Sequence, residues 1–208
     1  MNKIFLLIAF SIMSLSTDAQ KIDSKKILND INKKTKSFKN YKIEFDFTWE
    51  NQSLEIKENQ KGEITIEDKK FKLKIGDQLI INNGKTQWIY FIDLNEVQIF
   101  NNDIEDELMN PSKIFNIAIE EFKHELIDTK TINKQVVYNI DLYPKKSSEF
   151  IKINVTVIKD LSQIKELVVY DKNGGTYCYK IKSFKTDVQE SFSFDKKKYP
   201  NVQVIDLR

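Results

Sequence analysis

The chain has 208 residues, with 33 Lys and Arg against 31 Asp and Glu, a formal net charge of +2 and 40% hydrophobic residues. This balance lacks the strong positive charge of a nucleic-acid binder, and the sole arginine, Arg208, argues against the bidentate clamps that usually hold phosphates. The single cysteine, Cys178, excludes intramolecular disulfides, so the fold must depend on its apolar core.

The first 19 residues have the features of a cleavable secretory signal. Lys3 precedes an apolar stretch over residues 4–13, and Thr17 and Ala19 supply the small residues of a cleavage site. The stretch is too short for the ~20 residues that span a bilayer, so an uncleaved anchor is the weaker interpretation. We therefore expect residues 1–19 to be removed and residues 20–208 to form a single exported domain. Because no cysteine follows the signal directly, we expect no lipid anchor.

Residues 24–38 predict one amphipathic helix. Its apolar face contains Ile27, Leu28, Ile31 and Phe38, and Asp23 or Ser24 is available as the N-cap.

Strands are expected from residue 41 onward, where the apolar period changes to two. Tyr41, Ile43, Phe45, Phe47 and Trp49 alternate with polar residues, which is typical of a strand with one buried face. Further strands are expected at residues 62–66, 71–75, 78–81, 86–92 and 96–100. Asn83-Gly84 predicts a type I′ turn that places the two strands around it side by side.

A second helix is expected after an acidic stretch over residues 102–110, because Asn110-Pro111 places proline at a favoured first helical position. Its expected apolar face contains Ile114, Phe115, Ile117, Ala118 and Phe122. Strands are expected again at residues 137–143, 150–158, 164–170, 176–184 and 191–194. The order of helix, strands, helix, strands predicts an α+β fold with one large curved sheet of about 11 strands.

Several motifs in this order resemble the periplasmic lipoprotein carriers of the LolA-like family. They are the early helix, Gly62 followed by Phe71-Lys72-Leu73, the segment Asn83-Gly84-Lys85-Thr86-Gln87-Trp88-Ile89-Tyr90, and Pro111 opening a helix. Asp171-Lys172-Asn173-Gly174-Gly175, Phe192-Ser193-Phe194, Pro200-Asn201-Val202 and Val204-Ile205-Asp206 follow near the end. The resemblance covers nearly all of the chain after residue 19.

The resemblance implies an unclosed antiparallel β-barrel covered by helices on its concave side, with an apolar cavity for the acyl chains of a lipoprotein. The candidate cavity residues are Phe45, Phe47, Trp49, Phe71, Leu73, Ile75, Trp88 and Tyr90; for any one of them, packing in the core is the alternative. The helices that cover the cavity would contribute Ile27, Ile31, Phe115 and Ala118. The family commonly has an Arg and a Pro before the strand of Phe71, and the resemblance implies that this Arg helps to hold the helices closed over the cavity. This chain has Glu67-Asp68-Lys69-Lys70 there. Lys70 is therefore the candidate latch, although its ammonium group lacks the planar donor geometry of an arginine.

Catalytic groups are scarce. His124, the only histidine, is expected near the end of the second helix and lacks the second histidine of a metalloprotease pair. Cys178 lies between Tyr177 and Tyr179 in an expected strand with no histidine near it in sequence. A Cys/His pair formed in space stays open, but no residue is identified that would orient it. We expect a protein that is not an enzyme and needs no metal or cofactor.

The resemblance implies a soluble, monomeric periplasmic carrier. It would accept acylated lipoproteins from an inner-membrane ABC exporter and deliver them to the outer membrane, where a receptor could be a further partner. Its contact with membranes would be transient, and it would not bind nucleic acid. Three alternatives remain: a periplasmic sensor of lipid or mislocalised lipoprotein, a carrier of another amphiphile such as a glycolipid or pigment, and a hydrolase.

Overall fold

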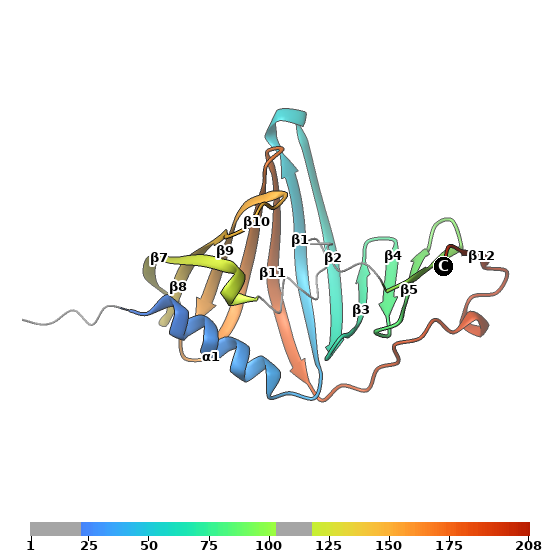
Figure 1. Ribbon diagram of the computed structural model, residues 1–208, viewed down its shortest axis with the longest axis horizontal. Helices are drawn as coiled ribbons and strands as arrows, with labels where there is room; N and C mark the ends of the chain where they lie inside the picture. The colour runs from blue at the N-terminus through green and yellow to red at the C-terminus, as the bar shows by residue number, and fades with distance from the viewer. Residues whose placement is uncertain (1–21, 103–117) are drawn as a thin grey trace, which may run out of the picture.

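The computed structural model describes residues 22–102 and 118–208, which form one α-helix, one sheet and three 3-10 turns (Figure 1). The helix is α1 (Ser24–Lys36). The strands are β1 (Tyr41–Asn51), β2 (Ile56–Glu67), β3 (Lys70–Ile75), β4 (Gln78–Asn82), β5 (Thr86–Phe91), β6 (Glu96–Asn101), β7 (Phe122–Ile132), β8 (Gln135–Pro144), β9 (Phe150–Ile158), β10 (Gln163–Asp171), β11 (Gly175–Thr186) and β12 (Gln203–Asp206). The 3-10 turns are η1 (Gln52–Leu54), η2 (Ile119–Glu121) and η3 (Lys196–Lys198).

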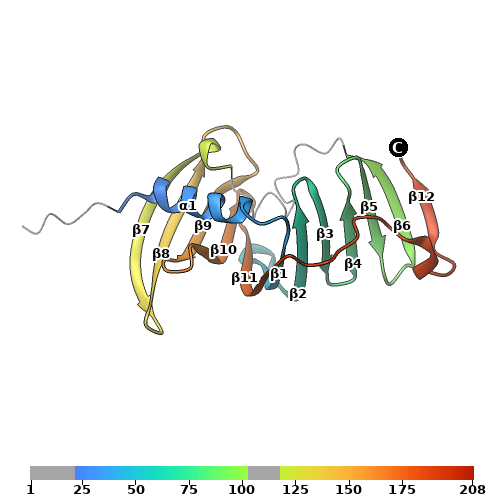
Figure 2. The same ribbon diagram turned by 90° about the horizontal axis from the view of Figure 1, so that it is seen from below.

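All strands belong to one 12-stranded sheet in the order β12-β6-β5-β4-β3-β2-β1-β11-β10-β9-β8-β7. β1 lies inside the sheet, antiparallel to β2 on one side and to β11 on the other. The short β12 runs parallel to β6, whereas the other neighbouring pairs are antiparallel. The edge strands β7 and β12 lie at opposite ends of the molecule, so the sheet does not close (Figures 1 and 2). The expected unclosed barrel is confirmed.

Helix α1 forms where the sequence predicts it. Asp23 accepts hydrogen bonds from the backbone N–H groups of Lys25 at 2.9 Å and Lys26 at 3.3 Å, which pairs two amides that the first turn leaves free. Leu28 and Ile31 are buried in the main apolar core. The helix thereby covers the concave face of the sheet on the side of β7 to β11 (Figures 1 and 2).

Apolar side chains pack on both faces of the sheet. The larger cluster fills the concave face between α1, β1 to β3 and β7 to β11. The smaller cluster lies on the opposite face, where β4, β5 and β6 contribute Leu79, Ile81, Tyr90 and Val97. Residues 187–202, here called the C-terminal arm, cover this second cluster with Phe192, Phe194, Tyr199 and Val202. The arm is a cover that periodicity did not predict.

Gly62 allows the side chain of Phe45 to fill the centre of the concave face. The two residues are cross-strand partners in β2 and β1, and a Cβ atom on Gly62 would lie 2.4 Å from Phe45 Cζ. Phe45 is 1% exposed and also packs at a tilt against Tyr179, with ring centroids 5.6 Å apart. The ring therefore occupies the space that any larger residue at position 62 would need.

Several local predictions were wrong. Phe122 opens strand β7 and does not continue a helix, and the short 3-10 turn η2 precedes it. The remainder of the expected second helix lies outside the described residues. The segment 191–194 is part of the C-terminal arm and is not a strand, whereas β12 was missed.

The Asn83-Gly84 turn is not of type I′. That turn needs positive φ at both central residues, whereas in this pair Gly84 alone has it, at 89°. Asn83 Oδ1 instead accepts hydrogen bonds from the backbone N–H groups of Lys85 at 2.9 Å and Thr86 at 2.8 Å. The predicted pairing of the two flanking strands, β4 and β5, is confirmed.

Candidate functional site

The eight candidate cavity residues do not share one surface. Phe45, Phe47, Trp49, Phe71, Leu73 and Ile75 lie on the concave face, and Trp88 and Tyr90 lie on the opposite face. The strand register shows why: Leu73 is paired with Ile80, whereas Trp88 is paired with Ile81, the next residue of the same strand. Trp88 and Tyr90 pack beneath the C-terminal arm, where the centroid of the Tyr90 ring lies 4.5 Å from that of Tyr199.

The six residues on the concave face differ in exposure. Phe45, Phe71 and Leu73 are 1%, 3% and 2% exposed and belong to the packed core. Phe47, Trp49 and Ile75 are half-buried. Only these last three present apolar surface that a ligand could reach without opening the core.

An apolar pocket of about 300 Å³ lies between the C-terminal half of α1 and the concave face. Its volume is at the lower end of the range typical of small-molecule sites. The helix, β1, the β9–β10 turn, β10 and β11 all contribute to its walls. The lining residues are Ile31, Lys34, Thr35, Phe38, Tyr41, Ile43, Ser162, Gln163, Ile164, Ile181, Phe184 and Thr186.

Tyr41 lines this pocket and was expected only as a strand residue. Its ring stacks on that of Phe184, with centroids 5.4 Å apart and planes 14° apart. The centroid of the Phe184 ring in turn lies 5.8 Å from that of Phe38. Tyr41 is 4% exposed, and its hydroxyl has no hydrogen-bond partner among the residues that the structure describes. Burial raises the pKa of this hydroxyl, which therefore stays protonated and able to donate.

A second hollow, an open groove of about 460 Å³, lies on the concave face beyond Phe45. Phe47, Ile75 and Phe91 line it, as do the acidic residues Asp77 and Asp93. The other residues of the groove are Gln60, Gln78 and Leu94. Since Ile43, Phe45 and Phe47 follow one another on the same face of β1, Phe45 lies between the pocket and the groove.

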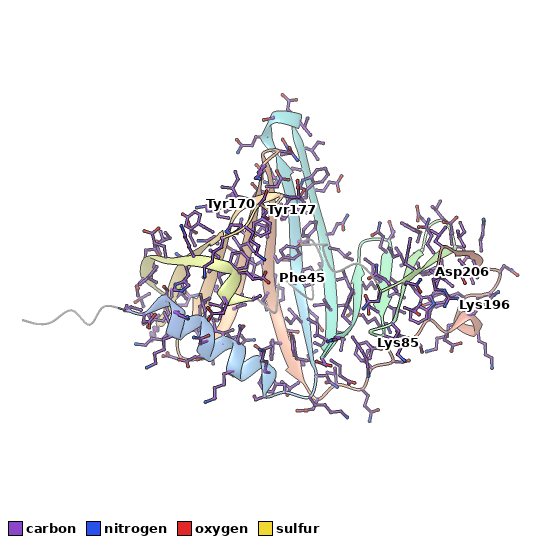
Figure 3. The ribbon with its side chains drawn as sticks, viewed as in Figure 1. Phe45, Lys85, Tyr170, Tyr177, Lys196 and Asp206 are labelled. Atoms are coloured by element: carbon purple, nitrogen blue, oxygen red, sulfur yellow. The ribbon has the colours of Figure 1, made fainter. Side chains whose placement is uncertain are left out.

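Aromatic rings continue along β1 and β11 above the groove. Phe47 lies 5.1 Å from Tyr179, and Trp49 stacks on Tyr177 with centroids 6.4 Å apart and planes 9° apart. Figure 3 shows Phe45 near the middle of the sheet and Tyr177 closer to the tip of the β1–β2 hairpin. The alternation of Tyr177 and Tyr179 with polar residues was the signal that could have placed both on the concave face.

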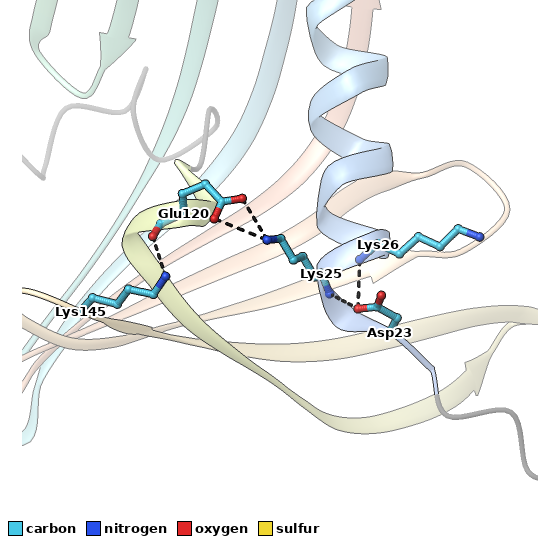
Figure 4. Close-up of polar contacts among 5 residues, drawn as sticks. All are labelled: Asp23, Lys25, Lys26, Glu120 and Lys145. Carbon is cyan, nitrogen blue, oxygen red and sulfur yellow. Dashed lines mark hydrogen bonds and ion pairs between the residues drawn. The ribbon is translucent and has the colours of Figure 1, made fainter.

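Two polar contacts hold the N-terminal end of α1 against the sheet. Ser24 Oγ and His124 Nδ1 are hydrogen-bonded at 2.9 Å, and Lys25 Nζ lies 3.1 Å from Glu120 Oε1 in η2. Figure 4 shows Lys25 reaching Glu120, whose backbone oxygen also accepts a hydrogen bond from Lys145 Nζ at 2.8 Å. The exposed ion pair of Lys25 with Glu120 contributes little stability, so the helix is held mainly by the burial of Leu28 and Ile31 in the core.

The residues expected to cover the cavity are distributed unevenly. Ile31 is buried and lines the pocket, Ile27 packs on the main core, and Ala118 is exposed beside η2. Phe115 lies outside the described residues. At the other end of the helix, Lys34 Nζ donates a hydrogen bond to the carbonyl of Leu161 in the β9–β10 turn.

Lys70, the candidate latch, contacts the C-terminal arm. Its Nζ atom lies 3.1 Å from Glu67 Oε1 of the same hairpin and 5.9 Å from the ring centroid of Phe192. Both contacts are on the face of the sheet opposite to α1, because Lys70 alternates with Phe71. Of these contacts of Lys70, one is with its own hairpin and one is with the arm, and neither involves the helix.

His124 and Cys178 do not form a pair. His124 in β7 lies on the same face of the sheet as the residues paired across the neighbouring strands, which are Leu142, Ile153, Val169 and Tyr177. Cys178 follows Tyr177 in β11 and therefore points to the other face. Burial raises the pKa of the Cys178 thiol, which disfavours a reactive thiolate. Among the described residues no group of three His, Cys, Asp or Glu side chains could hold a metal ion.

Within residues 22–102 and 118–208, the structure contains no helix that is both long and apolar enough to cross a membrane.

Comparison with known families gives a match over most of the chain. Residues 33–195 match the model of the family described as outer membrane lipoprotein carrier protein LolA. No curated protein matches the sequence.

Solved structures with a similar fold cover most of the chain at low identity. An uncharacterized conserved protein from Thermus thermophilus has a TM-score of 0.56 at 12% identity, over 88% of this chain and 99% of that one. A LolA superfamily protein from Nitrosomonas europaea has a TM-score of 0.44 at 10% identity, over 83% and 98% of the two chains. The MucA/MucB complex of Pseudomonas aeruginosa gives 0.39 at 11% identity, over 82% and 59%. The first of these likenesses concerns the fold alone, and the other two, with TM-scores below 0.5, add nothing to it.

Proposed function

Because the chain belongs to the LolA family of outer membrane lipoprotein carrier proteins, we propose that it is a periplasmic carrier that holds the acyl chains of lipoproteins on its concave face. It takes acylated lipoproteins from an inner-membrane ABC exporter and delivers them to the outer membrane, directly or through a receptor there. It acts as a monomer with transient membrane contact, and the transfer involves no covalent reaction and no cofactor.

The observation that carries this proposal is the form of the concave face. An apolar pocket beneath α1 and an open groove beyond Phe45 follow each other along β1, and half-buried Phe47 and Ile75 line the groove. Such a surface shields a chain from water without specific chemistry. Each buried CH₂ contributes ~0.8 kcal/mol, so exposing an acyl chain of ~16 carbons would cost on the order of 13 kcal/mol.

Release is as necessary to a carrier as binding. The largely apolar pocket recovers part of the cost of exposure, and the groove, which mixes apolar with polar residues, limits the affinity, so that it need not exceed the affinity of a membrane. In this proposal α1 shifts when an acyl chain enters or leaves, which the weak polar contact of Lys25 permits and the burial of Leu28 and Ile31 in the core opposes.

The test is release of lipoproteins from inner-membrane vesicles by the purified protein lacking residues 1–19. Phe47→Glu introduces a charge into the groove and is expected to reduce release at least tenfold while the circular dichroism spectrum and melting temperature stay close to wild type. The matched control is Thr48→Glu, which adds the same charge at the next residue, on the opposite face of β1.

Equal loss in both variants, or no loss in Phe47→Glu, would contradict binding at the groove. Unfolding of Phe47→Glu would assign Phe47 to the core. A wild-type protein that releases no lipoprotein but retains a glycolipid or pigment through purification would be a carrier of another amphiphile. One that instead binds a signalling protein would be a sensor.

A further inference from the structure

One edge of the sheet carries an excess of lysines. This basic edge consists of the end of α1 with the loop after it, the β7–β8 turn, the β9–β10 turn and the residue after β11. Residues 33–40, 133–134, 159–162 and 187 make it up, and they hold six exposed lysines against two aspartates. The charged residues are Lys33, Lys34, Lys36, Lys39, Lys134, Lys159, Asp160 and Asp187. None of the six lysines forms an ion pair with a residue that the structure describes.

Hydrogen bonds and strand ends join these segments into one rim. The ends of β7, β9 and β11 meet the beginnings of β8 and β10 at this edge. Lys34 Nζ donates a hydrogen bond to the carbonyl of Leu161, which connects the end of α1 to the β9–β10 turn. The backbone N–H of Lys159 donates to the carbonyl of Val136 at 3.0 Å, which connects that turn to β8. The lysines therefore stand on one side of the molecule.

An apolar side chain is exposed within the basic edge. Leu161, in the β9–β10 turn, is 43% exposed. Asp160 precedes it, but Lys159 lies next to that aspartate and Lys34 bonds to the carbonyl of Leu161 itself, so the surrounding charge is positive on balance. Ammonium groups attract anionic lipid headgroups, and an exposed leucine gains by leaving water for the acyl boundary. The combination suits a membrane surface.

Exposed leucines at the opposite edge have the opposite electrostatic setting. Leu54, at the tip of the β1–β2 hairpin, is 62% exposed, and Leu94, in the β5–β6 turn, is 66% exposed (Figure 1). Glu55 follows Leu54 directly, and Asp93 precedes Leu94. Exposure alone would favour these two turns over Leu161, but their acidic neighbours are repelled by an anionic surface.

The basic edge is also where the pocket beneath α1 ends. Lys34, Phe38 and Ser162 belong both to the walls of the pocket and to this edge. The open groove, in contrast, is lined by Asp77 and Asp93, which lie in turns of the opposite edge. Docking through the basic edge therefore turns the pocket toward the membrane and the groove away from it.

We infer that the basic edge docks on a bilayer that contains anionic phospholipids, with its lysines at the phosphate groups and Leu161 at the acyl boundary. The inference rests on the proposed function and adds to it the surface that makes the transient membrane contact and the class of lipid that this surface recognises. The contact is reversible, because one leucine buries far less apolar surface than a membrane anchor and the attraction of exposed lysines is screened by salt.

The first test measures binding of the protein lacking residues 1–19 to two kinds of vesicle, by sedimentation. One kind is phosphatidylcholine, and the other is equal parts of phosphatidylcholine and phosphatidylglycerol. Wild type is expected to bind the mixed vesicles far more tightly, with the difference disappearing at high salt.

Two triple variants with the same net charge locate the contact. Each lysine near an anionic surface strengthens binding by about fivefold, so changing Lys36, Lys39 and Lys159 to Gln is expected to weaken binding to mixed vesicles by about 10- to 100-fold. The matched control changes three exposed lysines that lie toward the opposite edge to Gln, and it is expected to bind within about threefold of wild type, as lysines outside the contact allow. These are Lys123, Lys146 and Lys172.

A second test places a fluorophore at each exposed leucine. Leu161→Trp is expected to shift its emission to the blue with mixed vesicles and not with phosphatidylcholine alone, after subtraction of the wild-type spectrum. Leu54→Trp, at the tip of the β1–β2 hairpin, is expected to show no shift with either kind of vesicle.

Equal loss of binding in the two triple variants, or a blue shift in Leu54→Trp and not in Leu161→Trp, would overturn the inference. So would a wild type that releases lipoproteins from inner-membrane vesicles yet binds neither lipid vesicle, and the carrier function would then stand. If the variant of Lys36, Lys39 and Lys159 also lost that release, the basic edge would face an acidic protein instead of a bilayer. A wild type that binds mixed vesicles through this edge but releases no lipoprotein would contradict the proposed function and leave the membrane contact in place.

Discussion

Gly62→Ala is expected to damage the centre of the concave face. The added methyl carbon would lie 2.4 Å from Cζ and 2.5 Å from Cε2 of Phe45, whereas non-bonded carbon atoms rest about 3.5–4.0 Å apart. The ring must therefore shift by about 1 Å or more, and because it is 1% exposed and packed against Tyr179, the shift disturbs its packing. The backbone of Gly62 does not have a positive φ, so the clash alone causes the effect.

Overpacking of this kind costs about 1–3 kcal/mol, which for a domain of this length lowers the melting temperature by about 2–12 °C. Urea denaturation followed by tryptophan fluorescence measures the loss. The control is the double variant Phe45→Leu with Gly62→Ala, because a smaller side chain at position 45 makes room for the methyl group. The double variant should lose less unfolding free energy than the two single variants lose together. A Gly62→Ala protein as stable as wild type, or strictly additive costs, would refute the proposed clash.

Two other perturbations test the supports around the site. Asp141 is buried and accepts hydrogen bonds from Lys152 at 2.6 Å and Asn154 at 2.7 Å; burial alone would raise its pKa, but these hydrogen bonds outweigh it and lower the pKa. Asp141→Asn is therefore expected to cost about 1–3 kcal/mol at neutral pH, with the difference from wild type shrinking below about pH 4 as the carboxylate is protonated, and a pH-independent difference in urea melts would contradict this. Ser24→Ala removes the contact with His124 and is expected to cost about 0.5–1.5 kcal/mol; hydrogen exchange should quicken in α1 and not in β8, and uniform quickening would show that the contact supports the whole fold.

The parts of the fold that were predictable are those with one strong signal. The period of Leu28 and Ile31 with the Asp23 cap predicts α1, and the strict alternation around Phe45 predicts β1. In β7, Phe122 and Leu126 are four residues apart, which suits a helix as well as a strand, so the local pattern alone did not decide.

The face assignment of Trp88 and Tyr90 failed for a different reason. Leu79, Ile80 and Ile81 are all apolar, so β4 has no polar face to show which of its sides belongs to the concave face. Only the register and the C-terminal arm decide the matter.

Tyr41 could not be identified as a site residue because its isolation is a property of the assembled pocket. In the sequence it is one more aromatic residue on an alternating strand. Only in the folded chain does Tyr41 line a pocket together with residues of α1, β10 and β11.

The measurement that tests the carrier role most directly is native mass spectrometry of the protein purified gently from the periplasm of its own host, with identification of whatever remains bound. The account predicts an acylated lipoprotein in complex with wild type and its loss in Phe47→Glu. A protein that is repeatedly empty, and that also releases no lipoprotein from inner-membrane vesicles, would contradict it and leave a LolA fold with another use.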